Sequence, residues 1–418
     1  MNINSQPRYA ARNLPLPLAL ICFGVLGCSY IVNAMDRQVF SLLLPTVMQT
    51  YGFPLNTGGL LVTIFTLGIG LAGIPAAYLM ERLSRRAVMI TSIAVFSVFT
   101  IMTAYAHGFT DMLIYRALTG VGEGMQIAAL YAATGAYFRK HRALMFGILS
   151  ALFGAGNFIG PLVAGSLLQS YDNWQVPLIV FGLAGIAFTI LVSFVPKDFT
   201  EHREQAREVS SSSAIVPERV WSINLVLAAI AAGTFGVYQY GYIALYPTYL
   251  AKQLQHAPGT VGFTMSMFGA GAILAVPAAY LGDRLSQKWI IFIALVCCAF
   301  AGYMLFNVAS TPTQHAILSF LVGFAGTAVI ANISSLMQRR VPPSYIAKAS
   351  GIFVTTVYLP ASISGYVLGS LVGAYGWGNA AAIQLSFVPL IGAVAILVSK
   401  ERDDARPTDH VVSAAAKA

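Results

Sequence analysis

Long apolar runs separated by short polar segments dominate this chain. A helix needs about 20 mainly apolar residues to cross the hydrocarbon core of a bilayer. Twelve stretches reach that length, at 15–48, 57–80, 87–106, 110–138, 144–170, 175–196, 221–250, 259–281, 289–308, 314–337, 346–373 and 379–399. The pattern predicts an all-α integral membrane protein with twelve transmembrane helices.

A single long hydrophilic stretch interrupts the series after the sixth run. It is rich in Glu and Arg and ends in the serines Ser210–Ser213, and it offers no apolar face that could form a core. Such a segment suits a surface helix followed by a flexible connector. We therefore predict an N-terminal six-helix bundle at 1–196, a cytoplasmic linker at 197–219, and a C-terminal six-helix bundle with a cytoplasmic tail at 220–418.

The two halves repeat each other. Residues 75–84 return as 277–286 with two differences, at an offset of 202 residues. Two shorter matches, Pro45-Thr46 with Pro247-Thr248 and Gly165–Leu167 with Gly369–Leu371, keep nearly the same offset. Parallel six-helix repeats related by a pseudo-two-fold axis, with substrate bound between them, are typical of one transporter architecture.

The composition excludes a soluble enzyme. Hydrophobic residues make up 57% of the chain and charged residues 9%, against roughly 25% charged in ordinary globular proteins. The four cysteines lie inside apolar runs, where packing is the expected role. No arrangement of serine, cysteine or metal ligands suggests hydrolysis, so we expect neither an enzyme nor a metal site.

The basic residues define the topology. Of 24 Lys and Arg residues, 21 fall on one side of the predicted helices, Lys252 falls on the other side, and Arg37 and Arg116 lie within helices. Cytoplasmic segments are the ones that carry the basic excess, so both termini are predicted to be cytoplasmic in a cell (inner) membrane. The net charge of +9 is spread over these loops, and we expect no nucleic-acid partner.

Four charges lie well inside the spans, namely Asp36 and Arg37 in the first helix and Arg116 and Glu123 in the fourth. Charges at such depth are costly and usually functional. Asp36 and Arg37 are adjacent and point in different directions, whereas Arg116 and Glu123 share a face but lie roughly 10 Å apart. Pairing between the two helices is the simplest solution.

The repeat indicates that these charges serve function rather than folding. At an offset of 202, Asp36 and Arg37 fall on Tyr238 and Gln239. At an offset of 204, the charges of the fourth helix fall on Phe320 and Thr327. A pair needed by the fold should tend to occur in both halves, and these charges occur in one.

The loop after the second helix resembles a signature of the major facilitator superfamily. Ala77–Arg86 follows the pattern G-x-L-a-D-r-x-G-r-r, with Glu81 in place of Asp and with Ala77 and Ser84 in place of Gly. The resemblance covers the whole chain and implies alternating access by rocking of two halves. It also implies a cytoplasmic gate formed by Glu81, Arg82, Arg85, Arg86, Asp283 and Arg284.

The intramembrane charges narrow this resemblance. Asn33-x-x-Asp36-Arg37, together with Arg116 and Gly122-Glu123, resembles the anion:cation symporter branch, which carries sugar acids and other organic anions. Spinster-type lipid transporters share a similar pattern. The resemblance implies that Arg37 binds the substrate carboxylate, that Asp36 and Glu123 carry protons, and that Arg116 is a charge-pair partner.

Two further helices supply candidate contacts. Gly156–Pro161 in the fifth helix resembles a glycine-proline motif of proton-coupled drug exporters, and Asn157 within it is a candidate ligand contact. In the seventh helix Tyr238, Tyr242 and Tyr246 share one face, and Tyr240 points away. We expect Tyr238 or Gln239 to touch substrate and the others to pack. The histidines near outer loops are expected to be solvated, namely His107, His256 and His315.

The sequence therefore predicts proton-coupled symport of a small organic anion, such as a sugar acid or another carboxylate, by a monomer in the bilayer. No cofactor is expected, and the coupling ion is expected to be H⁺. Three alternatives stay open: a proton-coupled drug or metabolite exporter, a spinster-like lysolipid or sphingolipid transporter, and a non-transporting membrane sensor or scaffold.

The basic asymmetry yields a labelling prediction. A cysteine introduced at Asp172 should react with an impermeant thiol reagent added outside the cell, because this position follows the fifth helix on the outer side. A cysteine introduced at Ser211 should stay protected until the membrane is permeabilised. The reverse pattern would contradict the twelve-helix layout.

Overall fold

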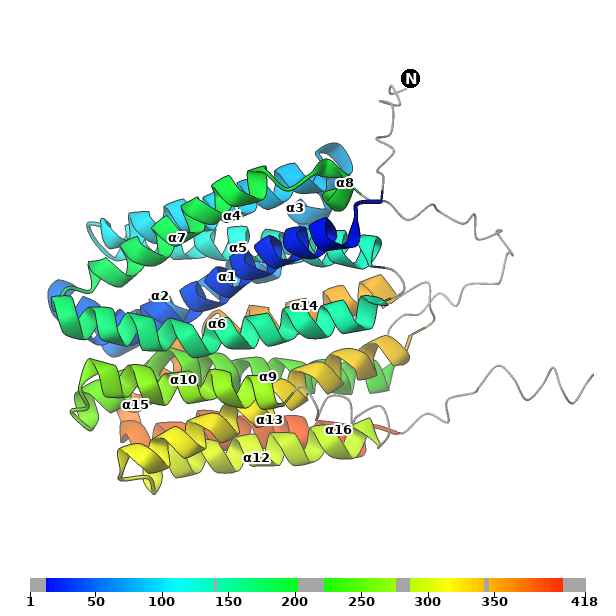
Figure 1. Ribbon diagram of the computed structural model, residues 1–418. Helices are drawn as coiled ribbons and strands as arrows, with labels where there is room; N and C mark the ends of the chain where they lie inside the picture. The colour runs from blue at the N-terminus through cyan, green and yellow to red at the C-terminus, as the bar shows by residue number, and fades with distance from the viewer. Residues whose placement is uncertain (1–12, 139–140, 202–221, 276–285, 342–345, 401–418) are drawn as a thin grey trace, which may run out of the picture.

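The structure is a computed structural model, and it describes residues 13–138, 141–201, 222–275, 286–341 and 346–400. All the regular secondary structure in these ranges is helical. The helices lie side by side in one long bundle, with the first half, coloured from blue to green, above the second half, coloured from yellow-green to red (Figure 1).

The first half contains six spans. They are α1 (Leu16–Tyr51), α2 and α3 together (Leu55–Thr63 and Phe65–Arg82), α4 (Arg85–Ala104), α5 (Phe109–Tyr137), α6 (Arg142–Tyr171) and α7 (Gln175–Ser193), followed by the short α8 (Lys197–Thr200). The N-terminal end of α1 and the helix α8 lie at the same end of the bundle (Figure 1). The predicted linker falls mainly at 202–221, outside the described residues, so the predicted domain boundaries stay predictions.

The second half is built in the same order. Its elements are α9 (Ile223–Thr248), the π-helix η2 (Tyr249–Gln253), α10 (Pro258–Leu274), α12 (Gln287–Asn307), α13 (Pro312–Arg339), α14 (Ile346–Ala361), α15 (Ser364–Ala381), the π-helix η4 (Ala382–Phe387) and α16 (Val388–Val398). Within α15, Gly376 has φ 76 and ψ 167. This backbone conformation, available mainly to glycine, separates the eleventh span from the twelfth.

The twelve predicted spans are confirmed. Nine stretches of the described chain are long and apolar enough to cross a bilayer, and one of them, Ala349–Val398, holds the last two spans. Helix α5 adds a span although it carries Arg116, Glu123 and Gln126. The described part of α10 has 17 residues and runs through the predicted eighth span.

The packing inside each half follows one plan. In the first half α3 and α4 pack on α5, α4 also packs on α7, and α1 packs on α6. The counterparts in the second half are α10 and α12 on α13, α12 on α16, and α9 on α14. The internal repeat read from the sequence therefore corresponds to repeated helix pairs.

Close glycine contacts fix the register of this repeat. A Cβ on Gly68 of α3 would meet the α5 backbone at Ala117, and a Cβ on Gly271 of α10 would meet the α13 backbone at Phe320. Gly68 and Gly271 are 203 residues apart, and so are their contacts Ala117 and Phe320. The offset of 204 used above was one residue too large here: Arg116 and Glu123 correspond to Ser319 and Gly326, rather than to Phe320 and Thr327. Neither structural equivalent carries a charge, so the asymmetry between the halves stands.

The two halves meet through α6 with α10, α2 with α15, α3 with α14, and α1 with α9. Gly59 of α2 lies directly against the backbone of Gly365 in α15, and Gly165 of α6 against that of Gly262 in α10. The Thr63 hydroxyl donates to the Ser362 carbonyl at 2.8 Å, which bridges the halves at the same place. These contacts lie toward the end of the bundle opposite α8, which the predicted topology assigns to the outside (Figure 1).

Candidate functional site

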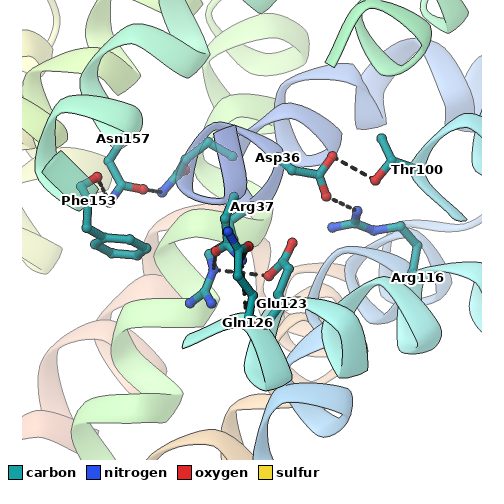
Figure 2. Close-up of polar contacts among 10 residues, drawn as sticks. Asp36, Arg37, Thr100, Arg116, Glu123, Gln126, Phe153 and Asn157 are labelled. Carbon is teal, nitrogen blue, oxygen red and sulfur yellow. Dashed lines mark hydrogen bonds and ion pairs between the residues drawn. The ribbon is translucent and has the colours of Figure 1, made fainter. Parts of the chain in front are cut away.

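The four intramembrane charges pair between α1 and α5. The Arg37 Nε atom lies 3.0 Å from Glu123 Oε2, and Arg116 Nη1 lies 3.7 Å from Asp36 Oδ2. All four side chains are buried. The predicted cross-pairing of the first and fourth helices is confirmed, and Figure 2 shows both pairs.

Glycines place Glu123 away from water. A Cβ on Gly122 would collide with α4 at Ser92 and Phe96, and a Cβ on Gly124 would collide with α3 at Ile69 and Ala72. The absence of side chains on either side of Glu123 thus lets two helices close over α5. Small residues serve this role in membrane helices.

The Asp36–Arg116 pair is enclosed on all sides. The Thr100 hydroxyl donates to Asp36 Oδ1 at 2.9 Å. The Arg116 guanidinium lies 5.0 Å from the centre of the Phe40 ring and 5.3 Å from that of Phe65, and its side chain is fully buried. Aromatic faces stabilise a cation that has been removed from water. Arg116 is therefore enclosed by rings and paired with Asp36 at ion-pair distance, although its three guanidinium nitrogens and Asp36 Oδ2 make no hydrogen bond within the described residues.

The Arg37–Glu123 pair is the closer of the two, and it also leaves polar atoms without hydrogen-bond partners in the part of the chain that the structure describes. Arg37 Nε also donates to Asn33 Oδ1 at 3.2 Å. Within the described residues, Arg37 Nη2 and both Glu123 carboxyl oxygens make no aligned hydrogen bond, although one carboxyl oxygen is at ion-pair distance. Buried polar atoms usually have hydrogen-bond partners. The pair therefore retains hydrogen-bonding capacity that a ligand could use.

A hydrogen-bonded chain orients Asn33 toward Arg37. The Asn33 amide donates to Gln126 Oε1 at 2.9 Å, and Gln126 Nε2 donates to the Ser29 hydroxyl at 3.0 Å. Because its amide nitrogen is engaged in this way, Asn33 presents its oxygen to the guanidinium. Asn33 is thus a positioning residue for Arg37.

Aromatic rings from four helices lie around Arg37. Its guanidinium carbon is 5.2 Å from the Phe153 ring of α6, and that ring stacks on Tyr30 of α1 at 5.3 Å. Tyr240 of α9 and Tyr358 of α14 lie 5.7 Å apart, and both interact electrostatically with Arg37. The second half therefore approaches the charge through tyrosines.

The sequence reasoning missed Tyr240. The pattern along the helix places Tyr240 on the side opposite Tyr238, Tyr242 and Tyr246, and the structure agrees. That side of α9 faces the first half, where the Tyr240 ring lies 5.9 Å from the Phe65 ring. The relevant signal was that α9 has two buried faces, one toward its own half and one toward the other.

The predicted substrate contacts differ in how far they are already engaged. Asn157 donates to the Phe153 carbonyl at 3.1 Å and accepts from Gln38 at 3.1 Å, so it bridges α6 and α1. Tyr238 is buried beside Phe235 and Cys298. Gln239 reaches toward Gly326, and its Nε2 has no partner among the described residues. Their roles as substrate contacts remain predictions.

The other tyrosines of α9 pack as expected, and one histidine differs from expectation. Tyr242 hydrogen-bonds to Ser319, and Tyr246 lies 2.8 Å from His315 Nδ1. His315 was expected to be solvated, but it is fully buried, because the rings of Tyr246 and Tyr249 pack against it. Among the other two, His107 is exposed and His256 is partly buried.

The gate motif is only partly described. Arg82 lies over the Tyr78 ring at 4.3 Å, Arg85 begins α4, and the Arg86 amide donates to Glu201 Oε1 at 2.9 Å. A carboxylate at the start of a helix is favourable. The Glu81 side chain, Asp283 and Arg284 lie outside what the structure describes, so the gate stays a prediction. Within the described residues no group of three or more His, Cys, Asp or Glu side chains could hold a metal ion.

The enclosed pair yields a stability prediction. Arg116→Leu should destabilise the protein by about 3–5 kcal/mol, because it leaves the Asp36 carboxylate buried without its counter-ion. Adding Asp36→Asn to Arg116→Leu should recover most of the loss, since the Thr100 hydrogen bond can persist. The measurement is thermal unfolding in detergent. Arg82→Leu, at an exposed position, is the control and should change little. A double variant no more stable than Arg116→Leu would show that the two residues do not form a pair.

Comparisons with known proteins agree with this architecture. The sequence model of the Major Facilitator Superfamily matches residues 26–249 and 228–416. The chain is 26% identical over 320 residues to a probable 4-methylmuconolactone transporter of Cupriavidus pinatubonensis, covering 74% of each chain. It is 21% identical to the 4-hydroxybenzoate transporter PcaK of Pseudomonas putida, covering 95% of this chain and 94% of that one.

Solved structures agree on the fold. A bacterial homologue of the human lysosomal transporter Spinster, in an inward-facing and unoccupied conformation, matches with a TM-score of 0.72 at 16% identity, covering 92% of this chain and 96% of that one. The nucleoside transporter NupG matches with a TM-score of 0.73 at 13% identity, covering 92% and 100%. With family matches that together span both halves and twelve helices in repeated pairs, the chain is a multi-pass membrane protein that belongs to the Major Facilitator Superfamily.

Proposed function

We propose that this transporter carries out symport of a small organic anion with protons by alternating access. The observation that carries the proposal is the Arg37–Glu123 pair, which has an unused donor and unused acceptors and, unlike the ring-enclosed Arg116, interacts with side chains of both halves. A substrate carboxylate fits the planar fork of an arginine through two parallel hydrogen bonds. Asp36 and Glu123 are the acids available for protons.

The coupling follows from competition for Arg37. When a substrate carboxylate takes the guanidinium, Glu123 loses its counter-ion in a site that excludes water. A buried carboxylate without a counter-ion favours its protonated form. Substrate binding therefore favours proton binding, and by linkage proton binding favours substrate binding to the same extent. The loaded, neutralised site can then be exposed to the other side when the halves rock.

The rings around Arg37 favour acids with a planar or otherwise apolar body. Tyr30, Phe153, Tyr240 and Tyr358 would contact the part of a substrate that extends from its carboxylate. Relatives named for 4-hydroxybenzoate, niacin and 4-methylmuconolactone fit that environment. A hexuronate transporter of Bacillus subtilis is also similar, at 21% identity, so sugar acids belong in any substrate screen.

Drug export is the second candidate, because one relative is a multidrug resistance protein MdtG of a Rahnella strain, 26% identical over 72% of this chain. The glycine-proline motif shared with exporters has a structural use here. Gly156 and Gly160 lie against α1 at Ile31 and Met35. The motif thus supports helix packing and does not by itself favour export over import.

The cellular setting completes the proposal. We place the protein in a bacterial inner membrane as a monomer, and the distribution of its basic residues supports a cytoplasmic location for both termini. In that orientation the closely packed glycine contacts of α2 with α15 and α6 with α10 lie on the outer side.

Uptake into proteoliposomes tests the function. Purified protein should accumulate at least one of labelled 4-hydroxybenzoate, nicotinate and glucuronate when the interior is alkaline. Arg37→Lys should weaken binding of that substrate at least about tenfold, because lysine keeps the charge but loses the bidentate geometry. Lys252→Arg, in η2 just after α9, is the matched control and should bind normally. Unchanged affinity in Arg37→Lys would remove Arg37 from the substrate site.

Glu123→Gln tests the coupling. Glutamine resembles the protonated acid in shape, so this variant should still bind substrate and exchange it across the membrane. It should lose accumulation driven by a pH gradient, because it has no proton to release. Exchange and net accumulation are measured in the same proteoliposomes. Normal pH-driven accumulation by Glu123→Gln would show that Glu123 does not carry the coupling proton.

A further inference from the structure

The charges of the site add up to zero. Arg37 and Arg116 contribute two positive charges, and Asp36 and Glu123 contribute two negative charges when ionised. The described helices of the second half carry Asp, Glu, Lys or Arg only near their ends, at Lys252, Lys288, Arg339 and Lys348. Net charge in a water-excluded site within the bilayer is costly. The number of charges that a substrate brings therefore determines how many protons must accompany it.

Only one of the two arginines can receive a carboxylate. Arg116 lies between the Phe40 and Phe65 rings, has no exposed surface, and pairs with Asp36. Both guanidinium groups have nitrogens without a hydrogen-bond partner among the described residues, but Arg37 keeps some exposed surface, lies over the Phe153 ring of the first half and interacts electrostatically with Tyr240 and Tyr358 of the second. A second carboxylate on the same substrate would be buried without a counter-ion.

Only one of the two acids loses its partner when substrate binds. Glu123 faces Arg37, which the substrate takes. Asp36 also interacts with Glu123 and Arg37, but its nearest counter-ion, Arg116, and its hydrogen-bond donor, Thr100, stay in place when a substrate takes Arg37. The charged or titratable groups that interact with Glu123 are Arg37, Asp36, Arg116 and Tyr240, while α3 and α4 bring Ile69, Ala72, Ser92 and Phe96 against its neighbours.

We infer that the site is built for one carboxylate and one proton, with Glu123 as the single exchangeable acid, Asp36 permanently ionised on Arg116, and monoanions as the substrate class. The inference rests on the proposed function. A monoanion changes the site charge from zero to minus one, and one proton restores zero. A second proton would leave the closed site with a charge of plus one. With one proton for each monoanion, transport is electroneutral.

The first test measures stoichiometry in the unmodified protein. Proteoliposomes are loaded with labelled 4-hydroxybenzoate, nicotinate or glucuronate, and the gradient at which net flux stops is measured at set pH differences. One proton per anion predicts a gradient of about tenfold for each pH unit, and two protons predict about a hundredfold at zero potential. A potassium diffusion potential imposed with valinomycin should not alter the one-proton result.

The outcomes separate the inference from the function on which it rests. Substrate exchange that no pH gradient can drive uphill, or no transport of any of the three anions, would show that the proposed function is wrong, and the inference would fall with it. Accumulation driven by the pH gradient, but near a hundredfold for each pH unit or dependent on potential, would overturn the inference alone.

The second test uses substrates matched in shape and different in charge. Terephthalate has a carboxylate in the position of the 4-hydroxybenzoate hydroxyl, and glucarate is the dianion corresponding to glucuronate. Neither dianion should inhibit uptake of its monoanion at neutral pH, because Arg116 is unavailable to the second carboxylate. Inhibition by a dianion as strong as that by the unlabelled monoanion would show that the site accepts two charges.

Discussion

The structure depends on the cost of placing charge inside a bilayer. Each charge at the centre of a membrane helix costs about 3 kcal/mol on insertion scales, and α1 and α5 together carry four. Pairing reduces this cost only if the charged residues of α1 and α5 lie at the same depth in the membrane and each helix is rotated about its axis so that opposite charges face each other. The glycines that flank Glu123, the rings around Arg116 and the chain from Ser29 through Gln126 to Asn33 all serve to maintain that crossing.

The two halves use the same scaffold for different chemistry. In the first half Arg116 lies over Phe40. The corresponding positions in the second half are Ser319 and Tyr242, which form a hydrogen bond. A charged interaction in one half is thus replaced by a neutral one in the other, with the helix packing unchanged. In the proposed mechanism, the second half, which has no charge near the middle of its spans, would move relative to the site without carrying charge through the membrane, and the first half would keep its cluster intact.

The sequence predicted most of the fold and the centre of the site, for identifiable reasons. Apolar length locates spans, and charge inside a span requires a partner, so pairing between the first and fourth helices could be predicted, whereas the choice of Arg116 for Asp36 and Glu123 for Arg37 came from the structure. The repeat offset was one residue too large between α5 and α13, because the short sequence matches do not cover these helices. Contacts between halves were harder to foresee. Tyr240 and His315 are ordinary in sequence, and their burial depends on helices far away along the chain.

The division of roles constrains how substrate binding could reach the second half. That half presents Tyr240 and Tyr358 to the site, and these side chains offer ring faces and hydroxyl groups rather than formal charge. Electrostatic attraction toward the bound anion is therefore weak from this side. In the proposed mechanism, closure of the two halves would depend instead on contact between rings and the body of the substrate, which is sensitive to shape. Arg37 and Glu123 would then recognise the charge that the proposed substrates share, and the tyrosines would distinguish one acid from another.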